Sequence, residues 1–346
     1  MIIPTTVLEL VERFERNLDI YKRADYKEAR VRIEFIDPFF EALGWDVRNV
    51  QGRGEHDKDV VYEDTIKIGA KTRAPDYSFR VGQTRRFFLE AKKPAISLVG
   101  DVGPAYQLRR YSWSVKLPLG ILTDFEEFAV YDCRQRPQPT DKANVGRIMY
   151  LTFDQYLDQF DEIYELFAKE SVQQGTLDRF AQDLKVKRGT NTVDTELLKE
   201  IENWRDVLAR NIALRNKALS VHELNFCVQR TIDRIIFLRM CEDRGIEEYG
   251  QLLALTNGPH VYPRLGEYYR RADEKYNAGL FDFQADKLTK ALTIEDKVLK
   301  PILTSLYYPQ CPYEFSVLPV EILGQVYEQF LGKVIRLTPA HRAKVE

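Results

Sequence analysis

The stretch from Ala74 to Pro94 constrains the fold of this chain more than any other, because its pattern is typical of a β-hairpin. Alternate residues from Tyr77 to Val81 are apolar, as the side chains of a half-buried strand are. A short polar turn over residues 81–84 leads to the apolar run at residues 87–89, which predicts a buried returning strand. We therefore expect two antiparallel strands here, at the centre of a sheet.

Polar side chains gather at one end of this expected hairpin. Glu90 and Lys92 are two residues apart on the second strand, so we expect them on one face of the sheet. Asp76 can lie opposite them on the first strand. Two carboxylates and an amine then converge in one small place. The alternative is an ordinary pair on an exposed strand, worth less than about 1 kcal/mol.

These residue types suit metal-dependent hydrolysis of a phosphodiester. Such a reaction needs a divalent cation held by oxygen atoms, an activated water and a positive charge near the phosphate. Mg²⁺ prefers one or two carboxylates and several waters. Asp76 and Glu90 would supply the carboxylates, and the carbonyl oxygen of Ala91 is within reach of the same ion. Lys92 would orient the water or lie near the phosphate, and Mn²⁺ would substitute for Mg²⁺.

Composition bounds the kind of protein. A chain of 346 residues predicts two or three domains, and 44% hydrophobic residues are enough for their cores. No run of 18 apolar residues and no secretory leader occurs, so we expect no membrane span and a cytoplasmic location. The net charge of −2 argues against a protein that coats nucleic acid, although it does not exclude a local basic patch.

The pattern along the chain predicts an α/β domain followed by an all-α domain. Residues 1–170 combine helices with short strands, which indicates a mixed central sheet flanked by helices. Residues 171–194 are polar and predict a linker, and residues 195–346 carry helical periodicity almost throughout. The expected helices lie near residues 5–18, 26–43, 104–116, 156–167, 197–208, 224–245, 264–276, 286–292 and 319–332. The further strands are expected near 60–62, 119–123, 128–131 and 148–153.

The site residues resemble the PD-(D/E)-x-K nuclease superfamily. Pro75-Asp76 is followed, after thirteen intervening residues, by Glu90-Ala91-Lys92, with an apolar strand directly before the glutamate. Gln107 and Tyr111 form a Q-x-x-x-Y pattern on one face of the next helix, as in helicase-linked and restriction-type members. The resemblance implies a restriction-endonuclease-like fold over residues 26–132, with Gln107 and Tyr111 helping to hold the site or the DNA.

Further residues complete the expected site. Many members of the superfamily carry an extra acidic residue on the preceding helix, and Glu34 takes that place; a solvated glutamate is an equally good interpretation. Positive side chains near the site could contact DNA phosphates, each steepening the salt dependence of binding by roughly 0.9 in log–log slope. These side chains are Arg85, Arg86, Lys93, Arg109, Arg110 and Lys116. A solvated helix face is the alternative for the arginines and Lys116.

The helical half resembles type IIG restriction–modification enzymes. Residues 234–245 are similar to their connector helix, and residues 318–332 to the segment before their adenine-N6 methyltransferase domain. The methyltransferase motifs do not occur in this sequence. The resemblance therefore implies the nuclease and connector of a longer parent. That parent would bind S-adenosylmethionine, which we do not expect of this segment, and would also carry the methyltransferase and target-recognition domains.

Together with the resemblance, the sequence predicts a Mg²⁺-dependent, type II (IIG) site-specific deoxyribonuclease module that cuts foreign double-stranded DNA in the cytoplasm of a prokaryotic cell. Dimerisation during cleavage is a further expectation. One alternative is the nuclease of a type I or helicase-coupled restriction system. Another is a DNA-binding or scaffolding module with a vestigial site. The presence of Asp76, Glu90 and Lys92 together speaks against the scaffold.

Overall fold

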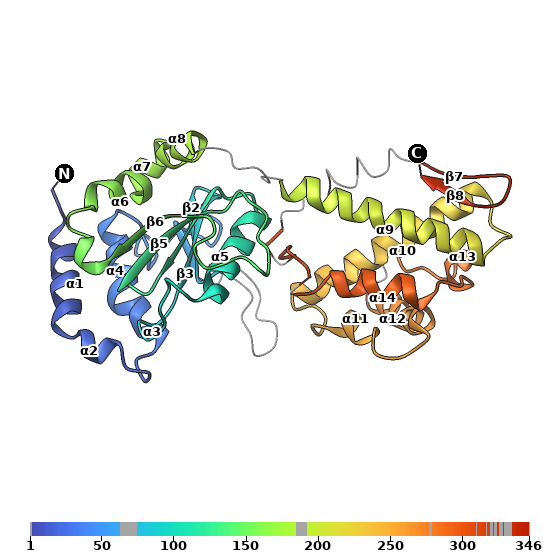
Figure 1. The fold of residues 1–346 in the computed structure, drawn as a ribbon, viewed down its shortest axis with the longest axis horizontal. Helices are drawn as coiled ribbons and strands as arrows, with labels where there is room; N and C mark the ends of the chain where they lie inside the picture. Colours follow the sequence, from blue (N-terminus) through green and yellow to red (C-terminus); the bar gives the residue numbers. More distant parts are fainter. Residues whose placement is uncertain are drawn as a thin grey trace. The chain divides into compact units, whose positions relative to one another are not determined.

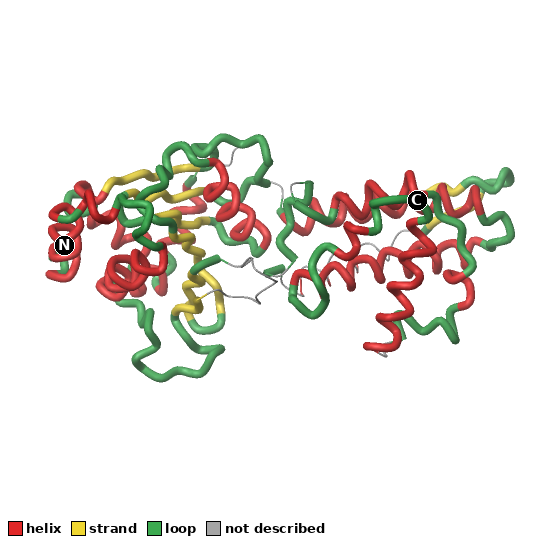
Figure 2. Tube along the Cα trace, turned by 90° about the horizontal axis from the view of Figure 1, so that it is seen from below, coloured by secondary structure: helices red, strands yellow, loops and turns green. Residues whose placement is uncertain are grey.

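In the computed structural model, the described part of the chain divides into two compact units, one ending at Thr192 and one beginning at Val193 (Figure 1). Strands run through the first unit, whereas the second is mostly helical (Figure 2). The structure describes residues 2–62, 75–184, 192–276, 279–308, 310–315, 317–318, 321, 324, 328 and 334–345.

The first unit is built on a six-stranded sheet in the order β1-β2-β3-β4-β5-β6. Strands β3 and β4 run parallel, and the other neighbouring strands are antiparallel. A parallel pair needs a crossover, which here contains α5 (Val102–Ser114). The expected mixed sheet is confirmed. The strands are β1 (Val60–Tyr62), β2 (Tyr77–Val81), β3 (Thr84–Ala91), β4 (Leu119–Thr123), β5 (Glu127–Asp132) and β6 (Arg147–Thr152).

Two apolar cores cover the two faces of this sheet. Alternate residues Phe87, Leu89 and Ala91 of β3 belong to the larger core, and Phe88 belongs to a smaller core under α5. This alternation places Glu90 on the face that α5 covers. The helices that contribute to the larger core include α1 (Thr5–Arg16), α3 (Glu28–Val31), α4 (Asp37–Ala42), α6 (Phe160–Phe167), α7 (Lys169–Gln173) and α8 (Thr176–Asp183).

The helix expected over residues 26–43 is interrupted by a π-helical turn, η1 (Arg32–Ile36), between α3 and α4. Pro38 explains part of this, because it has no N–H and cannot donate to the carbonyl of Glu34 four residues earlier. The Arg13 guanidinium donates to that carbonyl instead. The wider turn changes which side chains share a face, which matters for the site below.

The expected linker over residues 171–194 begins with structure of its own. Val172, Leu177 and Ala181 of α7 and α8 are buried, and α7 packs against β2. The first unit therefore extends past the predicted boundary at residue 170. The basic run at residues 185–191 lies outside the described residues.

The second unit combines the expected helices with a small sheet that an all-α prediction does not contain. Strands β7 (Ile335–Leu337) and β8 (Ala343–Val345) pair antiparallel. The amide of Asn225 both accepts from the Ile335 N–H (3.0 Å) and donates to the Ile335 carbonyl (2.8 Å), so it acts like a neighbouring strand. The helices are α9 (Val193–Arg215), α10 (Val221–Asp243), α11 (Gln251–Ala254), α12 (Val261–Tyr276), α13 (Lys287–Lys290) and α14 (Asp296–Ser305).

Most of the helix expected near residues 319–332 lies outside the described residues. Among the helices that are described, none is long and apolar enough to cross a lipid bilayer.

The turn between β4 and β5 contains a buried carboxyl group. Asp124 is fully buried, and its Oδ1 accepts from the Glu127 N–H at 2.7 Å, while its Oδ2 has no hydrogen-bond partner among the described residues. Burial raises the pKa of Asp124 well above its usual value, and the negative charges of Glu127 and Glu126 add to this. The folded protein therefore holds a proton on Asp124 more tightly than the unfolded chain does.

We predict that Asp124 makes stability decrease as pH rises. Its contribution is complete below the unfolded pKa near 3.8 and is lost as pH rises through the higher folded pKa. Asp124→Asn, which keeps an oxygen for the Glu127 N–H, should unfold at higher urea concentration than wild type, with a difference that grows from pH 5 to pH 8. Asp154→Asn on the exposed surface is the control. Parallel pH profiles of wild type and Asp124→Asn would contradict the assignment.

Candidate functional site

The hairpin register brings the two predicted carboxylates together. Tyr77 of β2 is paired with Leu89 of β3, so Asp76 and Glu90 occupy the next position of the ladder. The Ala91 N–H donates to Asp76 Oδ2 at 2.7 Å, which fixes the Asp76 side chain against the end of β3.

Glu90 lies in an unusually dry place for a carboxylate. Only 3% of the residue is exposed. Its Oε1 accepts from Lys92 Nζ at 2.6 Å and from Gln107 Nε2 at 2.8 Å. Its other oxygen, Oε2, is buried and has no hydrogen-bond partner among the described residues. One carboxylate oxygen is therefore satisfied and the other can still accept a ligand.

The electrostatics of this pair follow from burial. Burial, followed by the charge of Asp76, raises the pKa of Glu90 to about 8, although Lys92 opposes the shift. Burial also disfavours the charged form of Lys92, but Glu90, Asp76 and Glu28 together raise the pKa of Lys92 above its usual value. Lys92 thus stays charged. For Glu90, the loss of solvation on burial outweighs the attraction of the Lys92 ammonium.

Lys92 is held at the meeting point of β3, β4 and α3. Its ammonium donates to the Ala91 carbonyl at 2.8 Å and lies 3.9 Å from Glu28 Oε2. Its backbone N–H donates to the Thr123 carbonyl of β4 at 2.9 Å, which continues the sheet by one residue. Hydrogen bonds of both the Lys92 backbone and its ammonium group therefore fix the position of this side chain.

The residues present fit a hard divalent cation. Asp76, Glu90 and the Ala91 carbonyl supply oxygen atoms at the end of one strand pair, and Glu90 Oε2, which has no hydrogen-bond partner among the described residues, can accept a cation when the carboxyl group is ionised. No cluster of three or more His, Cys, Asp or Glu side chains with metal-binding geometry occurs in the part of the chain that the structure describes.

The structure does not bring Glu34 to this site. Glu34 Oε2 accepts from the Tyr26 hydroxyl at 3.2 Å, on the side of the π-helical turn that faces Arg13. Glu28 is the acidic residue near Lys92 instead, and sequence reasoning missed it. Burial raises the pKa of Glu28, with Lys92 opposing the shift, which is consistent with its place beside the site.

Arg32 links Asp76 to a group of polar and aromatic side chains. Arg32 Nη1 lies 3.5 Å from Asp76 Oδ1, and its guanidinium stacks 4.8 Å from the centre of the Tyr77 ring. The Tyr77 and Tyr62 hydroxyls donate to the buried Asp37 at 2.7 and 3.1 Å. Arg32 and Asp37 lie at the start and just after the end of the π-helical sequence, so that turn anchors the network.

The remaining predicted residues are placed as follows. Tyr111 lies one turn after Gln107 on α5 and is buried in the smaller core. Lys93 is partly buried and interacts electrostatically with Glu28, whereas Lys116 is exposed. At the hairpin turn, Arg85 is partly buried, and Arg86 pairs with Asp178 of α8 at 3.1 Å.

Arg109 and Arg110 differ from the expected DNA-facing arginines, because both are buried. Arg109 is 1% exposed and forms an ion pair with Asp141 at 2.8 Å, and Arg110 is 9% exposed. The loop that carries Asp141 covers this part of α5. Neither guanidinium is available to a phosphate in this structure.

Comparison with known proteins gives one informative match. The chain is 36% identical over 339 residues to "Type II restriction enzyme and methyltransferase RM.Eco57I" from Escherichia coli. The match covers 97% of this chain but 34% of that enzyme, so the chain spans about a third of the length of its relative. No family model matches the chain, and no solved structure matches it either.

The match extends across both units, including the connector-like residues 234–245 on which the second resemblance was based. Identity at this level over so long a segment confirms the resemblance to single-chain restriction–modification enzymes. The chain is therefore related to the type IIG restriction–modification enzymes, over a segment that corresponds to about a third of one of them.

Proposed function

We propose that this chain carries the Mg²⁺-dependent endonuclease module of a restriction–modification enzyme, which hydrolyses phosphodiester bonds of double-stranded DNA. The single observation that supports this most is the buried Glu90, with one oxygen held by Lys92 and Gln107 and the other without a partner. An unpaired buried oxygen costs free energy, and here it belongs to a carboxylate that lies beside a second one, Asp76, so a shared cation supports this arrangement better than a purely structural ion pair does.

In this proposal Asp76, Glu90 and the Ala91 carbonyl hold Mg²⁺. The ion would lower the pKa of a bound water and neutralise charge on the phosphate. The Lys92 ammonium donates to Glu90 Oε1 and to the Ala91 carbonyl. From there it can orient a water or the phosphate oxygen. Gln107 fixes the rotamer of Glu90, and Tyr111 braces α5 from within the smaller core.

The proposed DNA contacts are revised by the burial pattern. Lys93 and Lys116 remain candidates, together with Arg85 and Arg86 at the hairpin turn. Arg109 and Arg110 are left out, since their burial removes them from the surface. The cytoplasmic location, dimerisation during cleavage, the S-adenosylmethionine-dependent methyltransferase of the parent and its target-recognition domain belong to the same proposal.

We predict that Asp76→Asn and Lys92→Met each lower Mg²⁺-dependent plasmid nicking by about 100-fold or more, because Asp76 would hold the metal ion and the Lys92 charge would act on the water or the phosphate. Asn keeps an acceptor for the Ala91 N–H, so the hairpin should survive. Glu9→Gln on the exposed face of α1 is the matched control. Equal nicking by all four proteins would contradict the assignment.

Mn²⁺ binding measured by calorimetry separates the site from the activity. Asp76→Asn should lose Mn²⁺ affinity even if the chain needs the rest of its parent to cut DNA. Unchanged Mn²⁺ affinity in Asp76→Asn would favour the scaffolding alternative with a vestigial site.

A further prediction distinguishes Glu28 of α3 from Glu34 of η1. Glu28→Gln should weaken Mn²⁺ binding by about tenfold, because Glu28 lies beside Lys92 and adds negative charge to the site. Glu34→Gln should leave Mn²⁺ affinity unchanged, since the Glu34 carboxylate accepts from the Tyr26 hydroxyl, and the Arg13 contact is with its backbone carbonyl. The reverse ranking would show that Glu34, rather than Glu28, faces the ion.

A further inference from the structure

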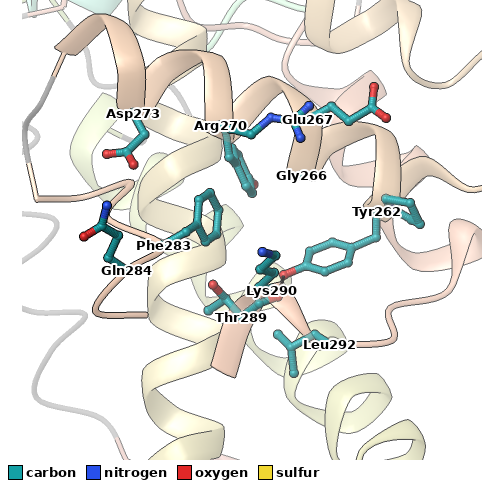
Figure 3. Close-up of a pocket in the computed structure, with 12 residues that line it drawn as sticks. Tyr262, Gly266, Glu267, Arg270, Asp273, Phe283, Gln284, Thr289, Lys290 and Leu292 are labelled. Carbon is teal, nitrogen blue, oxygen red and sulfur yellow. Dashed lines mark hydrogen bonds between the residues drawn. The ribbon is translucent and has the colours of Figure 1, made fainter. Parts of the chain in front are cut away.

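The second unit contains a pocket of about 450 Å³ between α12, α13 and the segment that joins them. Aromatic and charged side chains line it together. Figure 3 shows the Phe283 ring and the Lys290 side chain directed into the same space, with Gly266 and Arg270 on the helix across from Lys290. This volume is in the range of sites for small organic ligands.

Phe283 and Tyr269 form an aromatic wall of the pocket, and the buried Arg234 packs against both rings. The Arg234 guanidinium lies 4.6 Å from the centre of the Phe283 ring and 5.4 Å from that of Tyr269. Arg234 is itself 1% exposed and is fixed by Asp286 at 2.8 Å and by Thr289 at 2.7 Å. The rings therefore form a fixed platform whose position a ligand would not have to organise.

A buried hydroxyl on this wall is without a partner. Tyr269 is 1% exposed, and its hydroxyl oxygen makes no hydrogen bond with any described residue. The neighbouring Tyr262 hydroxyl, in contrast, donates to the Thr289 carbonyl at 2.7 Å. A buried hydroxyl without a partner is rare because it loses the hydrogen bond that water would give, so an acceptor from a ligand would satisfy Tyr269.

Gly266 opens the pocket in the middle of α12. Glycine destabilises a helix interior relative to alanine. Packing does not require it here, since an added Cβ would meet nothing within 4 Å. The missing side chain instead leaves room for a flat group in front of the aromatic wall.

The rim of the pocket carries two cations. Arg270 and Lys290 are exposed and form no ion pair with any described residue, even though Glu267 and Asp273 are three residues away from Arg270 on the same helix. Unpaired cations beside an aromatic platform suit an anionic group attached to a flat ring.

We propose that this pocket binds a nucleotide, with the heterocyclic base against Phe283 and the phosphate at Lys290 and Arg270. The Tyr269 hydroxyl would donate to an acceptor on the base. A free nucleotide and a single nucleotide of an unpaired DNA strand share this chemistry. The proposal does not depend on the nuclease site, which is in the other unit.

Binding of deoxyadenosine monophosphate and of a short single-stranded oligodeoxyadenylate to the full chain tests the proposal by calorimetry. Gly266→Leu should weaken binding by about tenfold or more, because its side chain fills the space for the base. Leucine is a better helix former than glycine, so the melting temperature should not fall. Lys290→Ala should weaken binding by about tenfold, and Lys287→Ala on the same short helix is the matched control with less than about a twofold effect.

Saturable binding of the mononucleotide that Gly266→Leu abolishes would assign the pocket to a free nucleotide. Binding of the oligonucleotide alone, also lost in Gly266→Leu, would assign it to a nucleotide within a strand. No saturable binding of either probe at millimolar concentrations, or equal binding by wild type and Gly266→Leu, would overturn the proposal.

Discussion

The contact between Glu90 and Lys92 is the constraint on which the site depends. Glu90 is carried into the sheet by β3, whose neighbouring residues Phe88 and Leu89 are fully buried, so the carboxylate cannot move out to water. A buried ion pair recovers its loss of solvation only when its remaining hydrogen-bonding positions are filled. Here Gln107 donates to Glu90 Oε1, whereas Oε2 has no hydrogen-bond partner in the part of the chain that the structure describes. The fold thus maintains a carboxylate with unsatisfied binding capacity, which is the property that a cation site requires.

The hairpin and its carboxylates were predictable from the sequence because they depend on local periodicity. Alternation from Tyr77 to Val81 indicates which side of β2 is buried, and the apolar run before Glu90 indicates β3. The turn, in which Gly82 adopts a φ of +59°, does not set the register at the carboxylates by itself, because a β-bulge between Phe79 and Arg80 shifts the pairing by one residue. The mixed sheet was predictable for the same reason. The roles of the residues themselves remain predictions.

The structure differs from the sequence predictions where a residue's position depends on distant parts of the chain or on irregular backbone. Helical periodicity cannot place Glu34 correctly, because the π-helical turn at Arg32–Ile36 changes the number of residues per turn. The burial of Arg109 depends on Asp141, 32 residues away, and no local pattern reveals that ion pair. The β7–β8 pair likewise depends on Asn225, which lies 110 residues before Ile335.

The two carboxylates lie at the open end of the β2–β3 hairpin, so their distance in space does not depend on how many residues separate them along the chain. Thirteen residues lie between Asp76 and Glu90 along the chain, but their proximity is set by the pairing of Tyr77 with Leu89. The turn at Gly82 lies at the other end of the ladder, where an added Cβ would meet nothing within 4 Å. The number of residues between the two acids therefore measures the length of the two strands and their turn, whereas the pairing of the strands brings the acids together.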